Sequence, residues 1–338
     1  MINDMTAFAL FIFAGIINGS FAVFTKYTPK WKFENIWLQF AVWSFFLVPW
    51  IFAFFLVPQI FKVYNQAEVN LIVIMIVGGI IFGIGQICFA IALKIVGIGL
   101  SFVINIGIGI ALGSLLPLIF QEHLFTMKNM FIFVAVIFSV IGIILSNYAG
   151  KSHHKMKREM ENIKEKSYYV LGVGLAIIAG LASAGQNLSF SLTAKLQDYA
   201  LQMGTSYVGS SIVMWPGFLT CSFLPYLIFM VILNVKNRSF KHYFEAGIKR
   251  YYLFGIIMGL FWFGSLVFYS KGASLIGKLG PVLGWPLFMI FIILASNFWG
   301  WRHGEWDRSS RKTKRFLLSG LSFLILSILL LGFLQFKF

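Results

Sequence analysis

The strongest constraint on this chain is the distribution of its apolar residues. They form ten stretches of about 20 residues, and each is long enough for a helix to cross a hydrocarbon core of roughly 30 Å. Hydrophobic residues make up 59% of the 338 positions and charged residues only 11%, too few charges to cover a water-soluble domain. Soluble globular, disordered and collagen-like proteins are therefore excluded. The predicted spans are 6–24, 36–58, 71–93, 97–120, 130–148, 168–192, 208–234, 251–270, 279–299 and 316–335.

The apolar stretches also decide between the two kinds of structure that cross a bilayer. A helix pairs its backbone polar groups within itself, whereas a barrel strand alternates apolar and polar side chains. These stretches are continuously apolar, so the sequence predicts an all-α integral membrane protein with ten transmembrane helices. No basic residue precedes the first stretch, and we expect a retained helix there rather than a cleaved signal peptide.

The balance of charge is strongly basic, with 27 Lys and Arg residues against 11 Asp and Glu residues and a formal net charge of +16. Nucleic-acid binding is one source of such an excess, but the positions of the charges indicate another. Twenty-one of the 27 basic residues lie in loops after odd-numbered spans, and the other six lie on the opposite side. Because basic residues accumulate in cytoplasmic loops, the sequence predicts that both termini are outside. No nucleic-acid partner is expected.

A polar linker over residues 150–167 divides the chain into two halves. The first half, 1–149, and the second half, 168–338, each contain five predicted spans, and the linker lies on the predicted cytoplasmic side. Because five is odd, the second half must be inverted relative to the first. Inverted repeats are common in secondary transporters, which bind their substrates where the two repeats meet.

Glycines give weak support for this inverted repeat. Ala14-Gly15-Ile16 in the first span matches Ala179-Gly180-Leu181 in the sixth, and Gly83 and Gly259 take related places in the third and eighth. Many glycines are spaced four apart, which lets helices approach closely in lipid. The run 107–113 could instead be a nucleotide-binding loop, but no strand precedes it and no P-loop lysine follows, so packing is the favoured interpretation.

Amide and tryptophan side chains within the spans are the candidate substrate ligands. Amides offer donors and acceptors that suit the hydroxyls of a sugar, and an indole face can stack on a pyranose ring. The alternatives are hydrogen bonding between helices for the amides and packing for the tryptophans. The candidates are Asn18, Gln39, Trp43, Gln86, Asn105, Gln186, Asn187, Trp215, Trp262 and Trp285.

Asp, Glu and His are absent from the middle of every predicted span, although proton-coupled carriers usually use one of these residues within the membrane. Glu34, at the cytoplasmic end of the second span, is the first candidate for proton coupling, and Glu122 is the second. Burial would raise the pKa of Glu34, whereas Lys26, Lys94 or Lys271 nearby would lower it. An ordinary surface ion pair is the alternative for Glu34. No catalytic set, metal cluster or cofactor motif is present, so an enzyme is not expected.

Several short motifs follow one another in order over nearly the whole chain. They are Lys30-Trp31-Lys32-Phe33-Glu34-Asn35-Ile36-Trp37, Trp43-Ser44, Leu47-Val48-Pro49-Trp50, Gly83-Ile84-Gly85-Gln86, Leu93-Lys94-Ile95-Val96-Gly97, Gly107-Ile108-Gly109 with Gly113, Gly259-Leu260-Phe261-Trp262, Gly284-Trp285-Pro286-Leu287 and Gly304-Glu305-Trp306. Together these motifs resemble the bacterial L-rhamnose–proton symporters. What this resemblance implies is a ten-helix carrier of the drug/metabolite transporter superfamily in the bacterial inner membrane, which imports a deoxy-sugar together with protons.

The leading hypothesis is therefore a sugar importer that works by proton symport and alternating access, with L-rhamnose or a similar hexose as substrate. The alternative is an exporter of neutral metabolites or drugs with the same fold. A membrane receptor or scaffold is the third possibility, but the loops offer a partner protein little surface, and no obligatory protein partner is expected.

Overall fold

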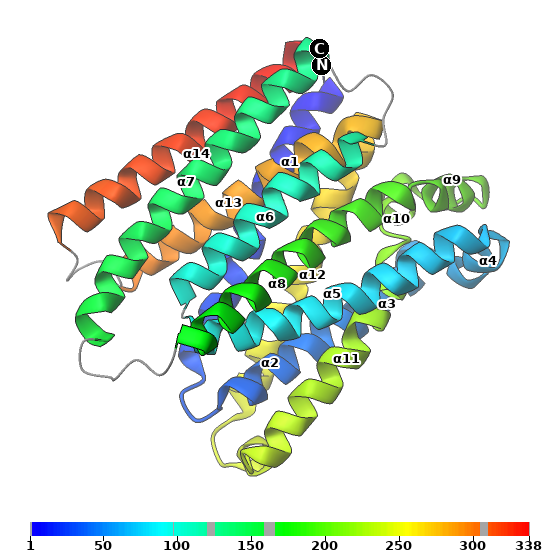
Figure 1. Ribbon diagram of the computed structural model, residues 1–338. Coiled ribbons are helices and arrows are strands. Elements are labelled where there is room, and N and C mark those ends of the chain that lie inside the picture. The colour runs from blue at the N-terminus through cyan, green and yellow to red at the C-terminus, as the bar shows by residue number, and fades with distance from the viewer. Residues whose placement is uncertain (1, 97, 120–125, 159–165, 305–309, 338) are drawn as a thin grey trace.

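The computed structural model describes residues 2–96, 98–119, 126–158, 166–304 and 310–337. Within these residues all regular elements are helices (Figure 1). In chain order they are α1 (Ile2–Ser20), η1 (Phe21–Tyr27), α2 (Phe33–Ala41), η2 (Val42–Leu47), α3 (Val48–Leu56), α4 (Ile60–Gln66), α5 (Val69–Ile95), α6 (Ile98–Ile119), α7 (Met127–Arg158), α8 (Lys166–Leu192), α9 (Lys195–Gln202), α10 (Tyr207–Ser211), α11 (Trp215–Lys236), η3 (Phe240–Phe244), α12 (Lys249–Ile276), η4 (Gly277–Leu279), α13 (Gly280–Arg302) and α14 (Arg311–Lys337).

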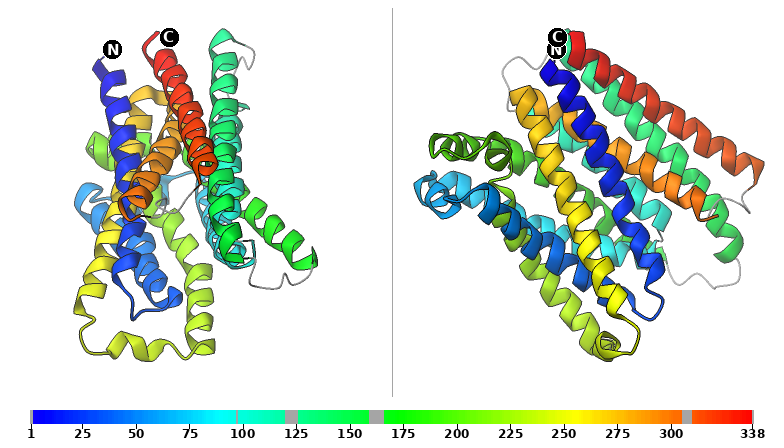
Figure 2. Two further views of the ribbon diagram at one scale, coloured as in Figure 1. Left: turned by 90° about the vertical axis from the view of Figure 1, so that its left-hand side faces the viewer. Right: turned by 180° about the vertical axis from the view of Figure 1, so that it is seen from behind.

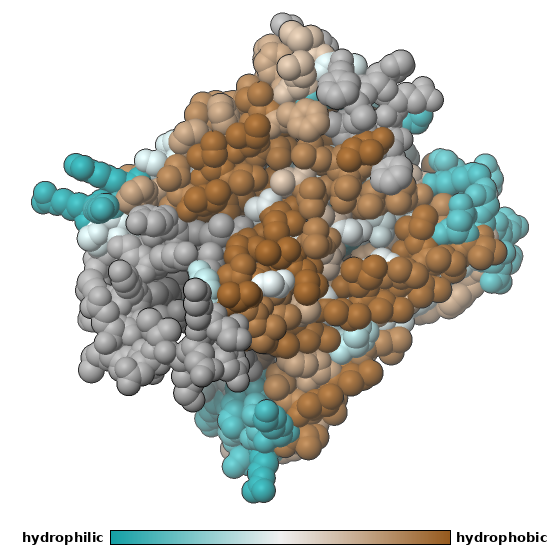
Figure 3. Space-filling model, viewed as in Figure 1, coloured by the Kyte–Doolittle hydropathy of each residue, from teal (hydrophilic) through white to brown (hydrophobic). Residues whose placement is uncertain are grey.

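Seven segments of the described residues are long and apolar enough to cross a membrane. One of them, 249–302, contains both α12 and α13, and two shorter apolar helical stretches lie at 104–117 in α6 and 129–145 in α7. Apolar side chains form a broad belt over the visible surface, and hydrophilic side chains gather at its two edges (Figure 3). An all-helical protein with several membrane spans is confirmed, whereas the count of ten spans stays a prediction.

The second predicted span is built from α2, η2 and α3 in a continuous run, and proline explains its middle part. Pro49 has no N–H for the carbonyl of Phe45, and its ring would collide with that carbonyl in a regular helix. The chain widens instead into the π-helix η2, where the N–H of Val48 donates to the carbonyl of Trp43, five residues back. Such π-bulges occur frequently at functional sites.

Helix α8 lies between α5 and α6, and α1 lies between α12 and α13 (Figures 1 and 2). Glycines permit the close approach of these helices. Gly15 lies against the backbone of α13 at Phe288, and Gly83 lies against the carbonyl of Ser222 in α11, so a Cβ at either glycine would collide with main-chain atoms. Small residues at such contacts are typical of helix packing in lipid.

The bundle has two distinct ends. Both termini lie at one end, where Gln197 of α9 accepts a hydrogen bond from Ser274 near the end of α12 (Figure 1); we call this the terminal end. At the other end, which we call the η3 end, η3 joins α11 to α12. There Trp31 donates to the carbonyl of His242, and Lys30 donates to the carbonyl of Ala246.

Candidate functional site

Asn187 connects four helices on the terminal side of the bundle centre. Pro117 lacks an N–H, so the carbonyl of Gly113 in α6 has no partner one helical turn later. The side-chain amide of Asn187 on α8 donates to this carbonyl at 2.7 Å and to the carbonyl of Pro281 on α13 at 3.0 Å. Its Oδ1 accepts from the hydroxyl of Tyr269 on α12. Asn187 is 0% exposed, so in this conformation the protein itself uses the whole amide.

Aromatic rings continue this buried region on both sides of Tyr269. The Trp285 ring lies 5.5 Å from the Tyr269 ring, and the Trp285 N–H donates to the carbonyl of Gly109 at 3.0 Å. On the other side Phe190 stacks on Trp215 with centroids 5.3 Å apart, and the Trp215 N–H donates to Ser270. The indole N–H groups are thus paired internally, as buried tryptophans require.

A second aromatic group lies nearer the η3 end, and its two tryptophans, Trp43 and Trp262, are half-buried. The Trp262 ring on α12 lies 5.0 Å from Phe45 and 6.0 Å from Phe40. Trp43 packs its Cβ against Gly259, one turn before Trp262. Asn18 on α1 donates to the hydroxyl of Ser265 at 2.7 Å, which places this predicted ligand beside the same part of α12.

Exposure divides the ten predicted substrate ligands into two groups. Those that are buried include Asn187, Trp215 and Trp285. Among those that are half-buried, Gln39 and Trp43 pack against Gly255 and Gly259 of α12, toward the η3 end. Two amides also carry buried atoms without a hydrogen-bond partner, Oδ1 of Asn105 and Nε2 of Gln186. Buried polar atoms are normally hydrogen-bonded, so each of these two atoms carries a desolvation penalty that a ligand with hydroxyl groups would remove. The buried group is Asn18, Gln186, Asn187, Trp215 and Trp285; the half-buried group is Gln39, Trp43, Gln86, Asn105 and Trp262.

Glu34 lies at the η3 end, where α2 begins, and its side chain faces the end of α11. Its carboxylate accepts hydrogen bonds from Asn237 and Ser239, both at 2.8 Å, and the residue is only 2% exposed. The neighbouring Asn35 amide donates to Asn234 at 3.0 Å, so two adjacent residues of α2 hold the C-terminal end of α11. We call these five side chains the Glu34 clamp.

Of the three lysines predicted near Glu34, Lys271 lies far from it, and the side chain of Lys94 is not described. Lys26 is exposed at the end of η1. Tyr252 lies at the η3 end, because its hydroxyl donates to the carbonyl of Tyr243 in η3. Lys271 is about 28 Å further along α12, at 1.5 Å per residue, and therefore lies far from Glu34. The side chain of Lys94 and the whole of Glu122 lie outside the described residues.

Sequence reasoning missed the partners that hold the candidate residues. Tyr269 lies seven residues after Trp262, a helical spacing that places both on one face of α12, and this spacing is the one available signal. Ser265, Ser270 and Ser239 are single hydroxyls whose partners come from distant helices. Among the described residues, no three His, Cys, Asp or Glu side chains lie close enough together to hold a metal ion.

Comparison of the sequence with known proteins finds a family and relatives that are named as transporters. The L-rhamnose-proton symport protein family matches residues 3–335. The L-rhamnose-proton symporter of Mannheimia succiniciproducens is 25% identical over 327 residues, and that of Yersinia pestis strain Pestoides F is 26% identical over 321 residues. Each alignment covers 91% of this chain and 91% of the relative. These relatives are named as transporters and not as enzymes, and the apolar helices agree with a multi-pass membrane protein. The chain therefore belongs to the L-rhamnose-proton symport protein family.

Proposed function

We propose that this protein imports L-rhamnose or a similar deoxyhexose together with protons, by alternating access between two inverted five-helix halves. The observation that carries this proposal is the family match, which extends over residues 3–335. The proposed location is the bacterial inner membrane with both termini outside, so that the η3 end faces the cytoplasm.

Helix packing supports the inverted halves. Under the proposed repeat, α1 of the first half corresponds to α8 of the second, and α5 and α6 correspond to α12 and α13. Helix α1 lies between α12 and α13 of the second half. Helix α8 lies between α5 and α6 of the first half. The pairing is therefore reciprocal, as a two-fold axis in the membrane plane requires.

The glycine contacts repeat in the same way. Gly15 of α1 lies against α13, and Gly180 of α8 lies against α6 at Asn105. Gly83 of α5 lies against α11, and Gly259 of α12 lies against η2. These are the glycines whose positions match between the two halves in the sequence, so each matched pair occupies matched contacts.

The exposure pattern supports an inward-facing conformation. The buried side chains around Asn187 would close the terminal side, because the Asn187 amide and the Trp285 indole are paired within the protein. The half-buried candidates toward the η3 end would then be the first to meet a sugar from the cytoplasmic side. Gln86 and Asn105 would bind hydroxyl groups, and the Trp262 ring would stack on the apolar face of the sugar.

The Glu34 clamp is the proposed place of proton coupling. Its carboxylate accepts from Asn237 and Ser239, and both hydrogen bonds are charge-assisted while Glu34 is ionised. Protonation would weaken both bonds and loosen α2 from α11 at the η3 end. A proton bound at Glu34 would in this way change the balance between two arrangements of the halves.

Transport by purified protein in liposomes tests the proposal. Labelled L-rhamnose should accumulate when the lumen is made alkaline, and a protonophore should abolish the accumulation. Uptake that only equilibrates would contradict proton coupling, and transport of neutral metabolites without any sugar would favour the exporter. Gln86→Ala should raise the half-saturating sugar concentration by about 2- to 12-fold, the equivalent of one hydrogen bond worth about 0.5–1.5 kcal/mol. Gln66→Ala, at an exposed position of α4, is the matched control.

A further inference from the structure

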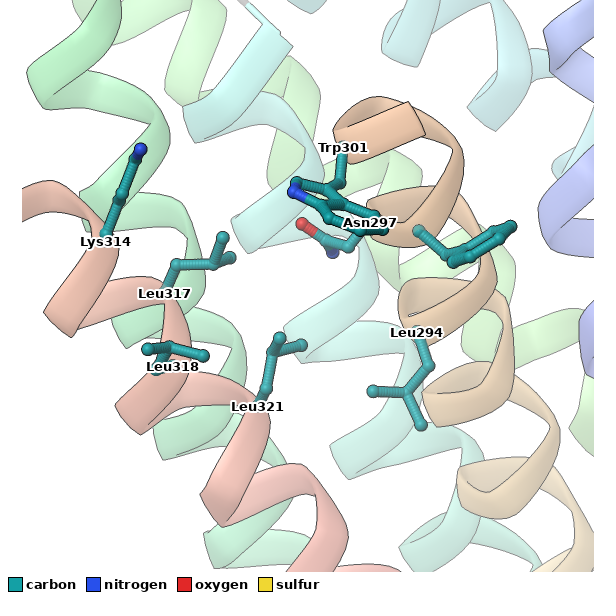
Figure 4. Close-up of a pocket in the computed structure, with 8 residues that line it drawn as sticks. Leu294, Asn297, Trp301, Lys314, Leu317, Leu318 and Leu321 are labelled. Carbon is teal, nitrogen blue, oxygen red and sulfur yellow. The ribbon is translucent and has the colours of Figure 1, made fainter. Parts of the chain in front are cut away.

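A pocket of about 390 Å³ lies between α13 and α14, away from the residues considered so far. Figure 4 shows that the two helices contribute side chains from opposite sides. Four residues of α13, from Leu294 to Trp301, line one wall, and four residues of α14, from Lys314 to Leu321, line the other. Both sets follow the spacing i, i+3, i+4, i+7, so each is one continuous stripe of its helix. We call the space between the stripes the α13–α14 groove.

The α13–α14 groove is polar at one end and apolar at the other. Asn297, Trp301 and Lys314 lie at the end where α13 finishes and α14 begins, and Leu294 and Leu321 lie at the opposite end (Figure 4). The polar end is open to the surroundings, because Trp301 is 65% exposed and Lys314 is also exposed. An occupant with a polar head and an apolar tail would match both ends at once.

Charge at the polar end indicates the sign of the occupant's head. The first turns of α14 carry Arg311, Lys312, Lys314 and Arg315, all exposed, and no acidic residue. Hydrophilic side chains project from the edge of the apolar belt where α14 begins (Figure 3). Tryptophan at the level of the headgroups and basic residues beside an apolar groove are the features by which proteins bind anionic lipids.

We infer that the α13–α14 groove binds an anionic phospholipid, with its phosphate beside Lys314 and an acyl chain along the leucines. The inference does not depend on the proposed transport of sugar. Ionic attraction between Lys314 and the phosphate gives the preference for an anionic head, and burial of the leucines gives the requirement for an acyl chain. A free anion would gain only the first of these contributions.

Native mass spectrometry of the purified full chain tests the inference, with phosphatidylglycerol and phosphatidylcholine of identical acyl chains as probes. The wild type should bind phosphatidylglycerol several times more tightly, and Lys314→Gln should weaken that binding about fivefold, from the loss of about 1 kcal/mol at one cation. Lys312→Gln is the matched control, because Lys312 is an exposed lysine of the same turn that does not line the groove. Leu321→Trp should weaken binding of both lipids by filling the apolar end.

Three results would overturn the inference. Equal affinity of the wild type for the two lipids would remove the anionic preference. An equal loss in Lys312→Gln and Lys314→Gln would indicate diffuse attraction to the basic turn rather than a site. Displacement of the lipid by glycerol 3-phosphate at the same concentration would indicate a phosphate site without a role for the acyl chain. Because Lys314 is exposed, its substitution should leave the unfolding temperature unchanged, which a thermal unfolding curve checks.

Discussion

Replacing Asn187 by alanine should destabilise the protein more than any other single amide substitution in the spans. The substitution removes three hydrogen bonds, two donated by Nδ2 and one accepted by Oδ1. Interhelical hydrogen bonds in membrane proteins contribute about 0.6 kcal/mol each on average, which gives about 2 kcal/mol for the three. The Gly113 carbonyl and the Tyr269 hydroxyl would also be left buried without partners, and each such group costs about 1–3 kcal/mol. We expect a loss of about 2–4 kcal/mol, since partial relaxation offsets part of this sum.

A double-mutant cycle with Tyr269→Phe separates the hydrogen bond from packing. Tyr269→Phe removes one hydroxyl and keeps the ring against Trp285 and Phe288, so its own effect should be near 1 kcal/mol. If Asn187 and Tyr269 are hydrogen-bonded, the double variant should lose less free energy of unfolding than the two single variants together. The difference should be about 0.6–1.7 kcal/mol. Reversible unfolding in a detergent titration, followed by tryptophan fluorescence, measures all four free energies of unfolding.

Two outcomes would refute this reasoning. A loss below about 0.5 kcal/mol for Asn187→Ala would mean that the four-helix connection contributes no more than an ordinary surface contact. Strict additivity in the cycle would mean that Tyr269 and Asn187 do not interact in the folded protein. If sugar transport falls while stability is unchanged, Asn187 would instead be a ligand in another conformation.

Three further predictions concern coupling, packing and pH. Glu34→Gln should abolish proton-driven accumulation but keep sugar exchange, because glutamine retains an oxygen that accepts from the two clamp donors; unchanged accumulation would remove Glu34 from the mechanism. Gly83→Val should prevent folding, because its side chain would overlap main-chain atoms, whereas Gly264→Ala has open space and should be tolerated when both are compared by size-exclusion chromatography. Lys195 donates a hydrogen bond to Glu68 and places a positive charge beside it, which lowers the pKa of Glu68. Their contact should therefore add stability at neutral pH and lose it as pH falls through the lowered pKa, so wild type and Lys195→Gln should become equally stable in acid.

The helical membrane architecture could be predicted because it depends on local properties. A run of about 20 apolar residues satisfies the length of the bilayer by itself, and a helix satisfies its own backbone. The same reasoning places Glu34 at a helix end, where the structure has it at the start of α2. The motifs that resemble the rhamnose symporters are also local, and the family match confirms that resemblance.

The partners of the candidate residues could not be predicted, because they come from distant parts of the chain. Asn18 and Ser265 are 247 positions apart, and Glu34 and Ser239 are 205 positions apart. Composition indicates that a polar side chain needs a partner in lipid, but not which of many serines and amides supplies it. The lysines expected beside Glu34 illustrate this limit, since Lys271 lies toward the opposite end of α12.

By itself the sequence determined that this protein is a bundle of membrane helices of the symporter family, since apolar length and short motifs are properties of neighbouring residues. Only the tertiary structure decided that the Asn187 amide donates to the Gly113 carbonyl, which Pro117 leaves without a partner in α6. It also decided that Glu34 holds the end of α11, and that a groove with one polar and one apolar end lies between α13 and α14. These features depend on how helices cross and rotate against one another, and that geometry is set by glycine contacts and ring packing throughout the bundle.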